Sequence, residues 1–165
     1  MGFLIRALAL AVVGIGLMVP AVATEPDPVS TVEEFVVALS HADLDALLSH
    51  VARDATVFAP LSSAPRRVEG REDIAALFEP FFARILENAG GHVEMNLVPL
   101  DLKVQVLGDV AVVTFHLGQV PDEPLAESYS FSRRTFVLRL AEGQWKIVHF
   151  HGSNVIIPPQ AVESG

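Results

Sequence analysis

The sequence predicts an α+β fold in which helices pack on one face of a curved, mostly antiparallel sheet. Apolar residues recur at helical spacing in the first half of the chain, whereas the second half alternates apolar and polar residues with the period of a strand. The expected strands of the second half follow one another in a row and are mostly joined by short turns. This order favours a helical layer packed on an antiparallel meander.

The N-terminus has the pattern of a secretory signal peptide. Arg6 precedes a short apolar run over 8–19, and Ala21-Val22-Ala23 fits the small-residue pattern of a cleavage site. The alternative is an uncleaved membrane anchor, but the run is short for a spanning helix and contains glycines. We therefore expect cleavage after Ala23 and an exported protein, periplasmic or secreted. The expected organisation is signal peptide 1–23, linker 24–29, α+β domain 30–157 and flexible tail 158–165.

The composition limits the partners of the domain. The formal net charge is −9, and it becomes −10 without residues 1–23, whose one charged side chain is Arg6. An acidic domain repels nucleic acid and anionic membranes, so we expect neither as a partner after signal cleavage. The chain contains no cysteine and therefore no disulfide, so its stability must come from its core.

Three helices are expected before the meander. Ser30 and Thr31 are each followed three residues later by a glutamate, which is the capping-box pattern of a helix start. A second, short helix is expected over 44–51. The third ends at Gly90-Gly91, and Pro80 is expected to kink it.

One strand is expected early in the chain and four later. The early strand covers 54–59, where Pro60 stops it, and a polar loop follows over 62–67. The later strands are expected at 97–107, 110–119, 133–141 and 145–151. Gly108-Asp109 and Glu142-Gly143 provide two of the turns between them.

Alternation assigns the side chains of these strands to two faces. The more apolar set is expected to face the helices and a cavity: Ala111, Val113, Phe115, Leu117, Phe136, Leu138, Leu140, Val148 and Phe150. The other set is expected to face outward: Thr114, His116, Thr135, Arg139, Trp145, Ile147, His149 and His151. A second subunit is expected to cover Val137, Trp145 and Ile147. Arg134 falls on the inward set at a strand end, where it would reach the cavity mouth.

Two segments resemble a known superfamily. Asp54-Ala55-Thr56-Val57 through Gly70-Arg71-Glu72-Asp73-Ile74 resembles the first-strand-to-helix segment of nuclear-transport-factor-2-like and SnoaL-like proteins. The stretch 143–153, GQWKIVHFHGS, is similar to the ending of the association domain of calcium/calmodulin-dependent kinase II and to that of iota-class carbonic anhydrases. The resemblance covers about residues 30–157 and implies a cone-shaped domain with three N-terminal helices packed on the sheet.

The departures from these families restrict the activities that the resemblance implies. Ketosteroid isomerases carry a base and an oxyanion-hole tyrosine at the positions that match Ala59 and Phe35, so enolisation would lack both groups. Kinase association domains carry cavity arginines at positions that match Gly152 and lie near Leu117 and Phe136. Iota-class carbonic anhydrases end in a run of three histidines and two serines. The matching stretch here is His149-Phe150-His151-Gly152-Ser153, in which Phe150 and Gly152 depart from that pattern.

We therefore expect an exported domain that binds a small, largely apolar molecule, with no cofactor and no metal. The candidate ligand-binding residues are Phe35, Ala59, Phe78, Phe82, Phe115, Leu117, Arg134, Phe136 and Phe150. Two alternatives stay open: a carbonic-anhydrase-like lyase and an association module that forms a homodimer or a larger oligomer. Whether the protein is an enzyme is left open, and the candidate catalytic residues are Tyr129, His149, His151 and Ser153. His116, His149 and His151 share one predicted face and could form a three-histidine metal site. The alternative, histidines at a subunit interface, is favoured.

Overall fold

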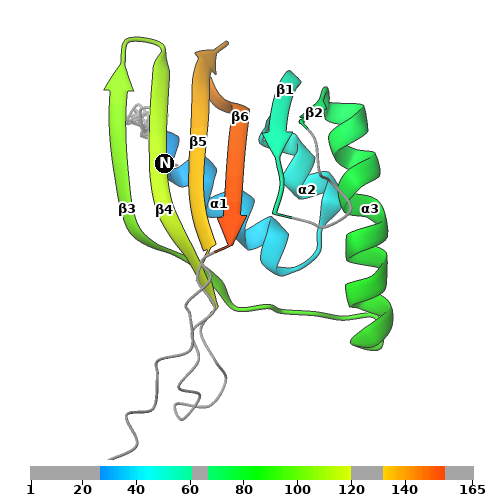
Figure 1. The fold of residues 1–165 in the computed structure, drawn as a ribbon. Coiled ribbons are helices and arrows are strands. Elements are labelled where there is room, and N and C mark those ends of the chain that lie inside the picture. The colour runs from blue at the N-terminus through cyan, green and yellow to red at the C-terminus, as the bar shows by residue number, and fades with distance from the viewer. Residues whose placement is uncertain (1–26, 61–66, 120–131, 155–165) are drawn as a thin grey trace, which may run out of the picture.

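The computed structural model describes residues 27–60, 67–119 and 132–154 of the chain. These residues form three helices and a six-stranded sheet (Figure 1). In chain order the elements are α1 Pro28–Ser40, α2 Leu44–Ser49, β1 Val51–Phe58, β2 Val68–Glu69, α3 Arg71–Asn88, β3 Leu97–Leu107, β4 Val110–Gln119, β5 Ser132–Ala141 and β6 Gln144–Asn154. The expected signal peptide, the tail 158–165 and Tyr129 lie outside the described residues.

The sheet has the strand order β2-β1-β6-β5-β4-β3. Every neighbouring pair is antiparallel except β1 and β6, which are parallel. Figure 1 shows α1 crossing behind the strands β4 to β6, while α3 stands beside the β1 edge. The helices therefore leave one face of the sheet uncovered, as expected for an α+β meander. No helix within the described residues is both long and apolar enough to cross a membrane.

The first helix begins earlier than its capping boxes predict. Asp27 is the N-cap residue, its side chain accepts a hydrogen bond from the backbone N–H of Val29 at 3.0 Å, and Pro28 opens the helix. Proline suits this position because the first helical N–H has no partner within the helix. Asp27 and Pro28, not Ser30 and Thr31, therefore define the start of α1. Two residues of the expected linker 24–29 belong to this helix.

The region from α2 to α3 differs from its prediction in two places. Strand β1 begins at Val51, so α2 ends before the last residue of the expected helix. Val68 and Glu69, just after the expected loop, pair with β1 as a two-residue edge strand. Helix α3 then runs continuously through Pro80 to Asn88.

A β-bulge in β6 changes which side chains face the helices. Val137 pairs with His149 and Leu138 with Ile147, so Val148 is an extra residue on β6. The inward side chains are therefore Trp145 and Ile147 before the bulge and Phe150 after it, and all three are buried. Strict alternation fails at the bulge. For this reason two predictions are wrong: that Val148 faces inward, and that Trp145 and Ile147 face outward and are covered by a second subunit.

The core lies between the inward face of the sheet and the three helices. Phe136, Leu138 and Ile147 on the sheet are at most 2% exposed, as is Val32 on α1. One buried polar residue fixes the segment that leads into β3: the Ser40 carbonyl accepts from the N–H of Met95 at 2.9 Å, and Ser40 Oγ accepts from the N–H of Leu97 at 3.2 Å. These bonds hold the start of β3 against the end of α1.

Candidate functional site

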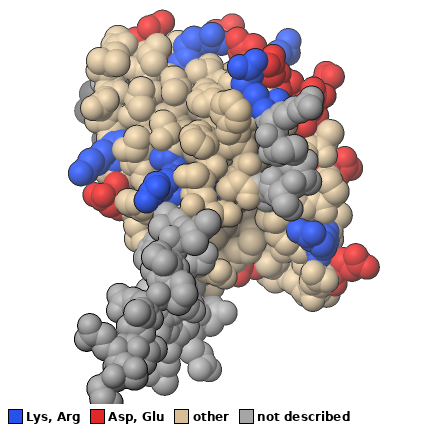
Figure 2. Space-filling model, in the orientation of Figure 1, with Lys and Arg blue, Asp and Glu red and all other residues tan. Residues whose placement is uncertain are grey.

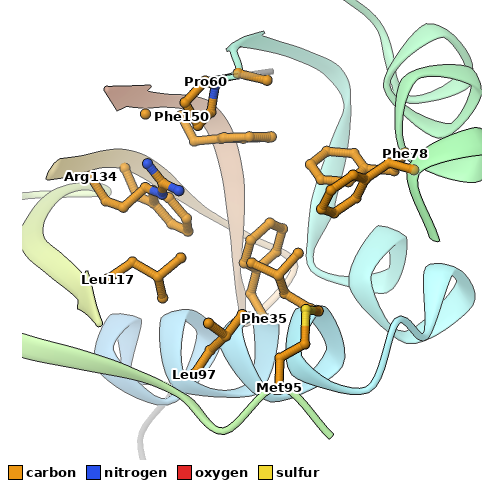
Figure 3. Close-up of a pocket in the computed structure, with 13 residues that line it drawn as sticks. Phe35, Pro60, Phe78, Met95, Leu97, Leu117, Arg134 and Phe150 are labelled. Atoms are coloured by element: carbon orange, nitrogen blue, oxygen red, sulfur yellow. The ribbon is translucent and has the colours of Figure 1, made fainter. Parts of the chain in front are cut away.

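An apolar cavity of about 200 Å³ lies between the helices and the sheet near the end of β6. The close-up in Figure 3 shows Phe35, Phe78 and Phe150 around the open space, with Arg134 reaching in from β5. The described residues that line it are Phe35, Leu39, Ala59, Pro60, Phe78, Phe81, Met95, Leu97, Leu117, Arg134, Phe136, Phe150 and Gly152. Arg134 is the one charged side chain among them.

Aromatic contacts build the wall of the cavity. Phe136 and Phe150 face each other across β5 and β6, with ring centroids 5.5 Å apart. Phe35 on α1 meets both rings, at 5.2 Å from Phe136 and 5.6 Å from Phe150. Phe78 on α3 approaches Phe150 at 6.3 Å. These are the usual separations of edge-to-face and tilted aromatic pairs, so the rings hold one another in place from three elements.

One register position places Arg134, the one cation among the described lining residues, at the cavity. Phe115, Arg134 and Gly152 lie directly across from one another on β4, β5 and β6, all on the inward face. A Cβ atom at position 152 would lie 2.4 Å from Arg134 Nη1 and 2.8 Å from Pro60 Cδ. Real Cβ atoms do not approach other heavy atoms so closely. The glycine therefore provides the space that the guanidinium occupies.

Among the described residues, little balances the charge of Arg134. Its Nη1 donates to the backbone carbonyl of Arg133 at 3.2 Å, and no carboxylate among the described residues forms an ion pair with it. Burial lowers the pKa of Arg134 to about 10, because the apolar surroundings disfavour the charged form. The guanidinium still carries its positive charge at neutral pH.

The structure brings together most of the candidate ligand-binding residues. Seven of the nine line the cavity: Phe35, Ala59, Phe78, Leu117, Arg134, Phe136 and Phe150. Phe82 and Phe115 are not among the lining residues; both are buried in the core, Phe82 against Phe78 and Phe115 against Phe136. Sequence patterns identify the residues of helices and strands that face inward. They do not distinguish residues that line a cavity from residues that are packed in the core.

Phe81, which the apolar stripe of α3 already placed in the core or the cavity wall, also lines the cavity, whereas sequence reasoning missed Leu39, Pro60, Met95, Leu97 and Gly152 as lining residues. Leu39 follows Phe35 by four residues on α1, so helical spacing was a usable signal for it. Met95 and Leu97 depend on how the segment after α3 returns beneath α1, which no local pattern reports. For Gly152 the resemblance indicates only the loss of an arginine, although a glycine inside a strand is itself typical of a close approach.

The histidines near the end of β6 lie on the other face of the sheet. His149 Nδ1 lies 2.7 Å from Thr56 Oγ1, and the ring of Phe58 meets His149 at 6.0 Å and His151 at 5.9 Å. Burial, His151 and Arg67 together lower the pKa of His149, in that order of importance. Neither imidazole is among the described residues that line the cavity, and neither is the half-buried Ser153. The described residues contain no group of three or more His, Cys, Asp or Glu side chains placed to hold a metal ion.

Comparison with known families identifies the domain. Residues 29–158 match the SnoaL-like domain family, and the chain therefore belongs to it. The α+β architecture is the nuclear-transport-factor-2-like fold, as the sequence resemblance implied. A search among curated proteins finds no match.

Solved structures with the same fold include proteins of different kinds. An NTF2-like protein of unknown function from Pseudomonas putida KT2440 has 21% identity and a TM-score of 0.62, covering 79% of this chain and 85% of that one. The association domain of C. elegans CaMKII has 21% identity and a TM-score of 0.59, covering 76% and 91%. A ketosteroid isomerase-like protein from Erwinia carotovora atroseptica SCRI1043 has 16% identity and a TM-score of 0.59, covering 78% and 93%. At these identities the likeness concerns the fold alone.

Proposed function

We propose that the domain binds a small, largely apolar molecule in its cavity and does not catalyse ketosteroid-isomerase-type chemistry. The observation that carries this proposal is the ring of phenylalanines around an open space that one polar side chain, Arg134, enters. Binding sites for small molecules are typically concave, mainly apolar and provided with few polar groups that set orientation. This lining fits that description.

The composition of the wall supports binding over enolisation. Ala59 and Phe35, which match the base and the oxyanion-hole donor of ketosteroid isomerases, both line the cavity. Neither side chain can accept or donate a proton, whereas enolisation needs a positioned base and a hydrogen-bond donor. A carbonic-anhydrase-like reaction in the cavity has equally little support, because His149 and His151 lie on the opposite face.

A ligand screen tests the binding proposal. The purified protein is titrated with single-ring ketones and acids, and binding is measured by thermal shift and calorimetry. Ala59→Leu fills part of the cavity without removing a core ring, so it should weaken every ligand that binds there. His149→Ala, on the other face, serves as the control and should leave affinity nearly unchanged. If no compound binds, or if Ala59→Leu has no effect, the proposal is wrong.

A second candidate function is self-association through the uncovered sheet face. We define this outer face by Phe58, Leu100, Val112, Val137 and His149. Phe58 and Leu100 are 43% and 39% exposed, so this face presents apolar surface that a second copy could cover. In Figure 2 the middle of this face carries few charged side chains, and most charges lie toward its rim. Several solved structures with this fold are association or hub domains of CaMKII.

Light scattering tests this second candidate. The wild-type protein should have the mass of a dimer or a larger assembly at micromolar concentration, and Leu100→Glu should shift it toward the monomer. Val37→Glu is the matched control, because Val37 is 55% exposed but lies on α1, away from the outer face. A wild-type mass equal to one chain would rule out the assembly.

A further inference from the structure

We infer that the ligand of this cavity is a small monocarboxylic acid, whose carboxylate is bound by Arg134 and whose apolar body packs against the phenylalanines. This inference rests on the proposed binding function and specifies the chemical class of the ligand. It concerns a site formed by the inward face of β5 and β6 together with α1 and α3.

The first argument is that Arg134 has no carboxylate partner within the described part of the chain. Among the described residues, Arg67 pairs with Glu69 and Arg139 with Asp54, whereas Arg71 donates to the backbone carbonyl of Val51 and does not line the cavity. Arg134 is more enclosed than Arg67 or Arg139, yet among the described residues it bonds only a backbone carbonyl. Arg134 is half-buried, and removing even part of a guanidinium from water is unfavourable unless an acceptor replaces the lost hydrogen bonds. A bound carboxylate would supply the missing partner.

The second argument is the space left beside the guanidinium. Gly152 has no side chain, and any Cβ there would overlap Arg134 Nη1 and Pro60 Cδ. The arginine can therefore lie along the backbone of β6 with its tip toward the cavity, as Figure 3 shows. A planar guanidinium presents paired N–H donors that match the two oxygens of a carboxylate.

The remaining lining restricts the rest of the ligand. The described residues that line the cavity include no aspartate or glutamate, so a cationic group would meet Arg134 and apolar surface there. A single arginine neutralises a monoanion but not a phosphate dianion, which leaves a carboxylate as the better match. An apolar cavity of about 150 Å³ holds a benzene molecule, so the 200 Å³ here accommodates one ring and a short acidic chain.

The test compares three compounds of one skeleton: phenylacetate, its neutral amide phenylacetamide, and the cation phenethylamine. Calorimetry on the purified protein should show that phenylacetate binds roughly tenfold or more tightly than the amide. The reason is that a charged acceptor strengthens the hydrogen bonds to the guanidinium by a free energy that corresponds to about this factor in affinity. Phenethylamine should bind most weakly. This comparison uses the wild-type protein and does not depend on how any variant folds.

Three variants then locate the effect. Arg134→Met keeps an unbranched apolar side chain but removes the guanidinium and its charge, so it should abolish the preference for the acid over the amide. Arg139→Met removes an exposed arginine that is paired with Asp54 and should keep that preference. Gly152→Ala, which forces the guanidinium to move, should also weaken the acid more than the amide.

The possible outcomes distinguish a failure of this inference from a failure of the proposed binding function on which it rests. If the amide binds as tightly as the acid, and Ala59→Leu weakens both, the acid inference is wrong and the apolar-binding function stands. If Arg134→Met retains the full preference for the acid, the site assignment is wrong. If none of the three compounds nor any member of the wider screen binds, both proposals are wrong.

Discussion

The two faces of β6 differ in chemistry because neighbouring residues point in opposite directions. Phe150 lines the cavity, and Gly152 leaves room there for the side chain of Arg134. His149 and His151 alternate with them and lie on the outer face. A single residue type at 152 therefore decides whether Arg134 can enter the cavity. At this scale the site depends on one glycine as much as on its aromatic side chains.

The histidines predict how stability depends on pH. Burial is the main cause that lowers the pKa of both His149 and His50, although Glu34 opposes it at His50. Below about pH 6.5 the unfolded chain takes up protons that these folded imidazoles resist. The free energy of unfolding should therefore be highest above this pH and should fall as the solution is acidified through it.

Urea denaturation at pH 7.5 and pH 5.5 measures this effect. His149→Gln should lose less stability on acidification than the wild-type protein, because it removes one imidazole whose protonation opposes folding. The exposed His92, replaced in the same way, provides the matched control. An equal loss in the wild-type and His149→Gln proteins would contradict the prediction.

Among the elements, α3 carries an unfavourable residue in its interior. Pro80 lies near the middle of an 18-residue helix, cannot donate the bond to the carbonyl four residues earlier, and is exposed. Pro80→Ala should therefore raise the free energy of unfolding, by up to about 3 kcal/mol. Urea denaturation checks this, with Glu79→Ala at the exposed neighbouring position as a control expected to change it by under about 0.5 kcal/mol.

A decrease in stability for Pro80→Ala would point to a different role for the residue. Phe78 and Phe81 flank the proline and line the cavity. If the proline shapes α3 so that these rings fit the sheet, replacing it would disturb their packing. The same measurement with a cavity ligand present would then show a weaker ligand-induced stabilisation than in the wild-type protein.

The elements also show what the sequence could predict. Periodicity located the three helices and the long strands, because each has a full stripe or face of apolar residues. It did not locate the two-residue β2, whose formation depends on pairing with β1. Nor did it place the bulge at Val148, since Ile147 and Val148 are both apolar and either can face inward. The inward positions of Trp145 and Ile147 could therefore not be derived from alternation.

In the whole molecule, the cavity is where segments distant in sequence meet. Phe35, Phe78, Arg134 and Phe150 come from four elements, and sequence patterns predicted that each faces inward. Patterns could not predict which inward residues border open space, because that depends on how far each helix stands from the sheet. Phe82 and Phe115 show this limit, since they satisfy the same pattern and fill the core.

We propose, finally, that the chain is exported and cleaved after Ala23. The expected cut lies upstream of Asp27, the N-cap of α1, so it would leave every described element intact. Expression of the full chain in a bacterial host should yield a periplasmic or secreted product whose N-terminal residue is Thr24, as determined by intact mass and N-terminal sequencing. Ala23→Lys should block cleavage, because the site requires a small residue, whereas Thr24→Ser should not. An uncleaved wild-type chain confined to the cytosol would contradict the proposal.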